Sequence, residues 1–330
     1  MKRFTPFLML MCFAFVAKSQ DLHYSMFFNS PLNLNPALTG QFIGDQRIHA
    51  NYRRQWYQWP VENQSFAVGG DIKLKNSEKP NFLSLGALIN YDVAGDLNTK
   101  FTGFDVFGAY SFKVGKGYMT PGLNVGVGVR SYNTANGTLG EFWNGNSLVP
   151  GTAIDPLYQG NGGIDKLYVD ANVGLNYRQV KSFRKFYDLG VSFNNLISPD
   201  VRFDENIGQE SNLLSKINIY GMANWRVADK IDLLANALVS LQDPYREIVL
   251  NGQGKIYLND EYTKALYLGA GIRLDDSWYP MIALQIEKLY VAFSYDLDIK
   301  EVNKGGGPEF AFRYIIASLP YTGKKPCPIY

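Results

Sequence analysis

Alternation between apolar and polar side chains constrains the fold of this chain more than any other sequence feature. Thirteen stretches of about ten residues show it between Ser65 and Ile316. In Leu167–Tyr177, all odd-numbered positions are apolar, whereas the even-numbered ones include aspartate, asparagine and glycine. Because successive side chains of a β-strand point to opposite faces, each stretch predicts a strand with one apolar and one polar face.

A fourteenth, weaker stretch covers about Arg47–Gln55. Strands of about ten residues with this alternation are typical of β-barrels that span an outer membrane, and single-chain bacterial barrels have an even strand number. We therefore predict an all-β fold: a transmembrane antiparallel up-and-down β-barrel of 14 strands over residues 46–317. Counts of twelve or sixteen strands stay open, as does a soluble β-sandwich, which also alternates.

The first nineteen residues are expected to be a removable signal peptide. Lys2 and Arg3 precede the apolar run Phe4–Val16, and Ala17-Lys-Ser19 fits a small-x-small cleavage site. Of the 32 basic residues in the chain, the leader holds three, which leaves 29 against 30 acidic residues. This balance gives no support to nucleic-acid binding.

Connection lengths predict which side of the membrane each strand end faces. The two longest connections, about Asn133–Asp165 and Leu196–Lys216, both follow odd-numbered predicted strands, whereas the connections after even-numbered strands are short. Long connections of such barrels face outward and short turns face the periplasm. The loop with Trp143, Pro150 and Pro156 is therefore a candidate surface platform, together with the second long connection.

Motifs outside the strands resemble the PorP/SprF family of Bacteroidetes outer-membrane proteins. They are Gln20-Asp-Leu-His-Tyr-Ser25, Asn35-Pro-Ala-Leu-Thr-Gly40, Arg54-Gln-Trp56, Gly307-Pro-Glu-Phe310 and Lys325-Pro-Cys-Pro328. The resemblance covers essentially the whole mature chain. It implies an outer-membrane component of the type IX secretion system and, in gliding species, of the adhesin machinery. The partners it implies are a secreted substrate or adhesin and periplasmic components tied to peptidoglycan.

The motif residues are candidate partner-binding or strap positions: Asn35, Pro36, Ala37, Gly40, Arg54, Gln55 and Trp56. Pro31 and Pro36 favour an irregular, extended segment over residues 20–45. It is expected on the periplasmic side, where it seals the barrel floor or enters the lumen, and it also offers a docking surface. The neighbouring arginines, Arg53 and Arg54, are expected to pair with lumen acids such as Asp71, Asp105 or Asp170, because a charge inside a barrel needs a partner.

No constellation for catalysis, cofactor binding or metal binding is apparent. The only histidines are His23 and His49, whose separation fits no metal-ligand spacing. A phospholipase-like use of His49 is a minor alternative. Cys327, in the predicted periplasmic tail 318–330, is either an inert thiol or the site of a disulfide to another chain. The main rival to an anchoring function is a diffusion or uptake channel, and outer-membrane lipids are expected neighbours in either case.

Overall fold

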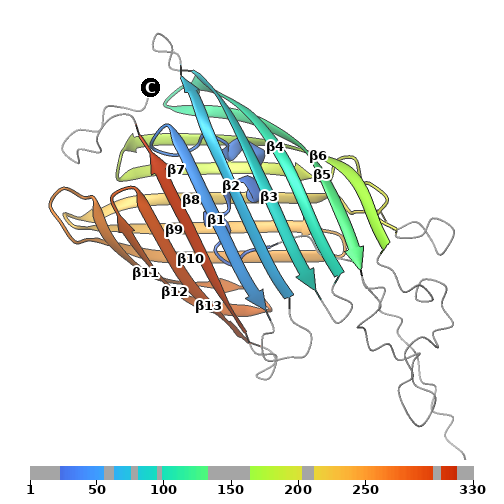
Figure 1. The fold of residues 1–330 in the computed structure, drawn as a ribbon. Helices are drawn as coiled ribbons and strands as arrows, with labels where there is room; N and C mark the ends of the chain where they lie inside the picture. Colours follow the sequence, from blue (N-terminus) through green and yellow to red (C-terminus); the bar gives the residue numbers. More distant parts are fainter. Residues whose placement is uncertain are drawn as a thin grey trace, which may run out of the picture.

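The computed structural model describes residues 23–55, 63–75, 81–94, 99–132, 164–202, 212–299 and 306–317. Within these ranges, fourteen antiparallel strands close into one barrel, in which β1 pairs with β14 (Figure 1). The strands are β1 (Gln46–Gln55), β2 (Asn63–Lys75), β3 (Phe82–Ala94), β4 (Thr99–Val114), β5 (Gly117–Tyr132), β6 (Ile164–Ser182), β7 (Lys185–Asn194), β8 (Lys216–Ala228), β9 (Ile231–Gln242), β10 (Tyr245–Tyr257), β11 (Lys264–Arg273), β12 (Ser277–Ile286), β13 (Leu289–Asp298) and β14 (Gly307–Ile316).

The predicted strand count and closed topology are confirmed, and the sandwich alternative is excluded. Every strand pairs with its sequence neighbour, and closure between β1 and β14 leaves no sheet edge open to other chains. The weak first stretch is a full strand, β1, because its partners on both sides satisfy its backbone.

The two faces of the wall differ as the alternation predicts. On β6, Leu167 is 66% exposed and Leu175 is 42% exposed on the outer face, whereas Tyr168 and Asn176 are buried on the inner face. Exposed Leu, Ile, Val and Phe side chains recur on every side of the barrel. A band of this kind loses its contact with water only inside a bilayer, so the wall has the surface of a membrane-spanning barrel.

The two ends of the barrel carry different connections. We call the end with the connections after odd-numbered strands the long-loop rim, and the other end the short-turn rim. At the short-turn rim, residues 115–116, 183–184, 229–230 and 287–288 are two-residue turns. At the long-loop rim, the described part of the β7–β8 connection folds back on itself through a bridge between Asp200 and Asn212.

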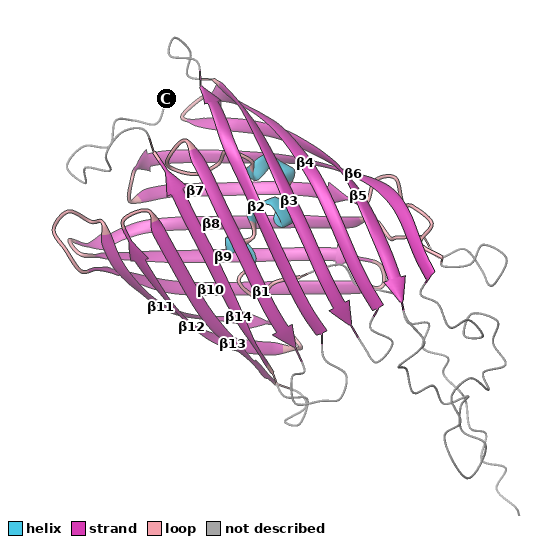
Figure 2. Ribbon diagram, in the orientation of Figure 1, coloured by secondary structure: helices cyan, strands magenta, loops and turns pink. Residues whose placement is uncertain are grey.

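Residues 24–42 lie inside the barrel, and we call them the plug (Figure 2). They form η1 (Phe27–Asn29), α1 (Pro31–Leu34) and η2 (Pro36–Leu38) before the chain enters β1. The expectation of an extended segment is wrong here: Pro31 and Pro36 each begin a helical turn, where the fixed φ of proline is favourable and its missing N–H costs nothing. The plug runs through the lumen between the two rims, from Ser25 beside Glu309 to Gly40 beside Asp71.

Several predicted features lie outside the described residues. They are the signal peptide, Trp56, the loop residues Trp143, Pro150 and Pro156, and the tail with Cys327.

Candidate functional site

Asn35 fixes the middle of the plug to the barrel wall. Its Oδ1 accepts a hydrogen bond from the backbone N–H of Ala37 at 2.7 Å, which caps η2. Its Nδ2 donates to the carbonyl oxygen of Val191 on β7 at 3.0 Å, to that of Leu175 on β6 at 3.3 Å, and to the Tyr220 hydroxyl on β8 at 3.2 Å. One fully buried side chain therefore joins the plug to three strands.

Two glycines of the wall leave room for this part of the plug. Gly122 on β5 and Gly174 on β6 lie opposite each other across the strand pair. A Cβ on Gly174 would overlap Oδ1 of Asn35, and a Cβ on Gly122 would lie 2.5 Å from the backbone nitrogen of Ala37. The wall and the Asn-Pro-Ala motif thus fit each other only while both wall positions lack a side chain.

Leu34, just before the motif, is held through its backbone. Its carbonyl oxygen accepts hydrogen bonds from the Ser192 hydroxyl at 2.9 Å and from Asn218 Nδ2 at 3.1 Å. Because helix ends leave carbonyl oxygens without partners inside the helix, these wall side chains satisfy the end of α1.

Gly40 ends the plug near the short-turn rim. Its φ of +76° is a left-handed conformation that favours glycine, and its N–H donates to Oδ2 of Asp71 at 2.6 Å. Asp71 is paired with Arg47 on β1 through two hydrogen bonds of 2.8 and 2.7 Å, and Arg47 also donates to the carbonyl oxygen of Leu38. This bidentate pair connects the plug to β1 and β2.

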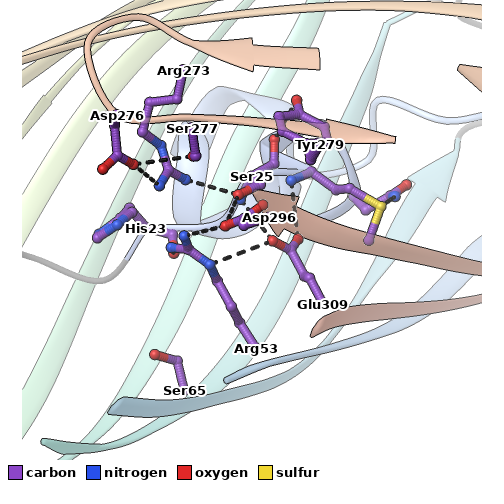
Figure 3. Close-up of polar contacts among 12 residues, drawn as sticks. His23, Ser25, Arg53, Ser65, Arg273, Asp276, Ser277, Tyr279, Asp296 and Glu309 are labelled. Carbon is purple, nitrogen blue, oxygen red and sulfur yellow. Dashed lines mark hydrogen bonds and ion pairs between the residues drawn. The ribbon is translucent and has the colours of Figure 1, made fainter. Parts of the chain in front are cut away.

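At the long-loop rim, Glu309 binds the start of the plug (Figure 3). Its carboxylate accepts hydrogen bonds from the backbone N–H groups of Ser25 at 2.7 Å and Met26 at 3.0 Å. The Ser25 hydroxyl donates to Asp296 at 2.8 Å, and the carbonyl oxygen of Ser25 accepts from the Tyr279 hydroxyl at 2.8 Å. Side chains of β12, β13 and β14 thus bind two consecutive residues of the plug.

Arginines balance these buried acids. Arg53 on β1 lies 2.6 Å from Asp296 and 3.8 Å from Glu309, and it donates to the carbonyl oxygen of His23. Arg273 on β11 donates to the Ser25 hydroxyl (Figure 3). It also pairs with Glu247 at 2.7 Å. Arg53 is only 2% exposed, so removing its charge would leave two carboxylates buried without their cation.

The expected ion-pair partners of Arg53 are wrong. Arg53 pairs with Asp296 and Glu309, and Asp71 pairs with Arg47. The reason is barrel closure: the register between β1 and β14 places Arg53 directly opposite Glu309. Sequence reasoning missed these ion pairs because Arg53 lies more than 240 positions from Asp296 and Glu309. Pairing the first and last predicted strands would have brought Arg53 close to Glu309.

The other predicted motif residues fall into two places. Four of them are buried in the plug: Asn35, Pro36, Ala37 and Gly40. The other two, Arg54 and Gln55, are half-buried at the end of β1. Arg54 and Gln55 pair through their backbone with Gln64 and Asn63 of β2. Partner binding by any of these residues stays a prediction.

Apolar packing fills much of the lumen around the plug. Met26, Phe27, Leu34 and Leu38 pack with inner-face residues of β8 to β14, including Tyr220 and Tyr290. On the opposite side, Tyr24 and Leu32 pack against Ala67, Leu88 and Phe107. A cavity of about 90 Å³ lies beside Leu32 and Asn33, lined mainly by asparagines, aspartates and aromatic rings of β3 to β7.

Metal-ligating side chains do not cluster in the described residues. No group of three or more metal-ligating side chains occurs among them. His49 is buried in the lumen. Among the described residues, neither of its ring nitrogens has a hydrogen-bond partner, so no serine hydroxyl is bonded to it. None of the helices in the described ranges has the length and apolar character needed to cross a bilayer.

Solved structures resemble the fold at low sequence identity. A FadL homologue of Pseudomonas aeruginosa matches with a TM-score of 0.51 and 12% identity, over 85% of this chain and 92% of that chain. The translocator domain of the autotransporter NalP from Neisseria meningitidis matches with a TM-score of 0.43 and 12% identity, over 88% and 94% of the two chains. The first likeness places the fold among outer-membrane barrels. No curated protein matches the sequence.

A family model covers nearly the whole barrel. The model described as type IX secretion system membrane protein PorP/SprF matches residues 16–314, which include the plug motif and all but the end of β14. This family is one of secretion-system membrane proteins and is not an enzyme family. The chain is an outer-membrane β-barrel that belongs to the PorP/SprF family of type IX secretion system membrane proteins.

Proposed function

We propose that this protein binds and anchors a secreted cell-surface protein, such as an adhesin, at the long-loop rim and contacts periplasmic machinery at the short-turn rim. It performs no chemistry in this role. The orientation follows the rule that short turns of such barrels face the periplasm.

The plug carries the proposal. Glu309 and Asp71 accept hydrogen bonds from its backbone at the two rims, and Asn35 bonds to the wall between them. Leaving the lumen would break all three sets of contacts. Glu309 and Asp71 would then lose the backbone N–H groups that they bind, and a hydrogen bond to a charged group contributes about 1.5–3 kcal/mol. Because the plug is held firmly inside the lumen, the barrel is better suited to presenting fixed surfaces than to conducting solutes.

The long-loop rim offers such a surface. Val201 and Leu213 of the β7–β8 connection pack against Tyr168 on β6. Leu196 and Ile197, at the start of this connection, remain 48% and 54% exposed. Exposed apolar residues can form the contact surface for a partner protein. The long β5–β6 connection begins at the same rim.

Surface retention of secreted type IX proteins tests the proposal. Residues 134–162 and 203–211 are replaced by short Gly-Ser linkers, and surface biotinylation with mass spectrometry measures which secreted proteins stay on the cells. We expect the double replacement to release the partner into the medium while the barrel remains in the outer membrane. A matched control replaces residues 95–98, a shorter connection of the same rim, and should retain the partner. Unchanged retention in the double replacement would contradict the proposal.

A further inference from the structure

The outer wall of the barrel carries a groove over β6 to β11. It has a volume of about 970 Å³, and it is lined mainly by outward-facing residues of these strands. Elsewhere on the wall the outer face presents large side chains such as Leu85, Phe104 and Val125. Along the middle of the groove, one position on each of four consecutive strands carries no side chain larger than a methyl group.

The strand register explains the shape of this groove. Ala223, Ala235, Gly252 and Ala270 lie directly opposite one another from β8 to β11 and form the floor. Leu189, Leu250 and Ile272 border the floor on the side of the long-loop rim, and Trp225 borders it on the other side. A Cβ built on Gly252 meets no atom within 4 Å, so the floor opens onto space that the protein leaves unfilled.

The groove has a polar and basic end. Continuing the floor toward β6, the register places Tyr187 opposite Ala223 and Gln179 opposite Tyr187. The Lys181 ammonium group lies 5.5 Å from the centre of the Tyr187 ring, and Trp225 Nε1 donates to the Tyr187 hydroxyl at 2.9 Å. Among the described residues, no carboxylate forms an ion pair with Lys181.

The position of this end agrees with a membrane interface. Gln179 lies three positions before the end of β6, at the short-turn rim, whereas Ala270 lies six positions into β11 from the same rim. Because strands of such barrels tilt by about 35–45°, a row that crosses them also climbs into the hydrocarbon region. Tyr, Trp and Lys side chains characterise the interface. The groove thus runs from the headgroup level into the apolar core.

We propose that this groove is a binding site for one phospholipid of the periplasmic leaflet, with its phosphate near Lys181 and Gln179 and an acyl chain on the Ala/Gly floor. Charge complementarity supports this occupant, because a cation without an acidic partner favours an anionic headgroup at the membrane surface. The floor of small apolar residues between larger ones gives an acyl chain room to lie along the wall.

Native mass spectrometry of the full-length protein, purified in mild detergent, tests the site. Gly252→Leu fills the floor, and Gly108→Leu is its matched control, because Gly108 is on the outer face of β4 and its Cβ position is equally open. We expect wild-type protein to retain phospholipid and Gly252→Leu to lose most of its lipid occupancy, since the leucine side chain takes up the space in which the acyl chain lies. Gly108→Leu should bind as the wild type does.

The charged end is tested with titrations of phosphatidylglycerol and phosphatidylethanolamine. Lys181→Gln should reduce the preference for phosphatidylglycerol by about fivefold, as expected for one lysine near a membrane surface. The control is Lys264→Gln, at the exposed start of β11 on the same rim but outside the groove. Equal lipid retention in wild type and Gly252→Leu would overturn the proposal. The proposal would also be overturned if Gly252→Leu lost a bound partner protein or a second copy of the chain while its lipid occupancy stayed the same.

Discussion

Gly174 on β6 lies directly against the side chain of Asn35, so that a single methyl group at position 174 would overlap Oδ1 of the asparagine. The same asparagine bonds to three wall strands and caps η2. The wall and the plug therefore form one packed unit at the centre of the barrel.

Gly174→Ala should displace the plug from its seat. Inserting one methyl group into such packing costs about 1–3 kcal/mol, so the free energy of unfolding in lipid vesicles should fall by that amount in urea titrations. Gly108→Ala is the control, because its added methyl group meets nothing within 4 Å. Equal stability of the two variants would show that Asn35 is not held as described.

Arg53→Ala should loosen the start of the plug. Asp296 and Glu309 would stay buried without their cation, which costs about 3–5 kcal/mol. In a Cys327→Ser background, His23→Cys reports on exposure of the plug through its rate of maleimide labelling on whole cells. The rate should rise when Arg53→Ala is added.

The matched variant combines Arg53→Met with Asp296→Asn and Glu309→Gln. Removing all three charges avoids an unpaired buried ion and should recover much of the lost stability. If Arg53→Ala labels no faster than its parent, the rim network does not hold the plug.

Gly40→Ala should be more costly than Gly115→Ala. Both glycines have positive φ, at +76° and +59°, so both substitutions carry a backbone penalty of about 1–2 kcal/mol. At position 40 the new methyl group also meets the Ser84 side chain, whereas at position 115 nothing lies within 4 Å. Urea titration of the two variants should separate these effects, and equal losses would argue against the tight approach at Gly40.

The barrel was predictable because its signal is local. Alternation with a period of two residues marks each strand without knowledge of its partners, and the weak stretch Arg47–Gln55 corresponds closely to β1. The alternation in Leu167–Tyr177 stops before β6 does, because the strand continues to Ser182 through outward polar residues such as Gln179. Such polar residues are expected beyond the hydrocarbon region of the membrane. The apolar alternation therefore stops there, although the backbone hydrogen bonds of the strand continue.

The plug was less predictable because its contacts are distant in sequence. Ser25 bonds to Glu309 and Asn35 to Val191, and neither pair leaves a local pattern. The prolines correctly indicated a break before β1, but the same residues also start helical turns. The groove was not foreseen either, since single alanines and glycines become a row only once the register of four strands is known.

Conductance across planar lipid bilayers tests most directly whether the protein is a plugged anchor or a channel. The purified wild-type protein should remain silent, because the plug is held at both rims and packed against the wall between them. A variant that lacks residues 23–42, refolded into the same lipid, should conduct steadily through its polar lumen. Steady, substrate-sensitive currents from the wild-type protein, at the level of the variant without the plug, would contradict the account.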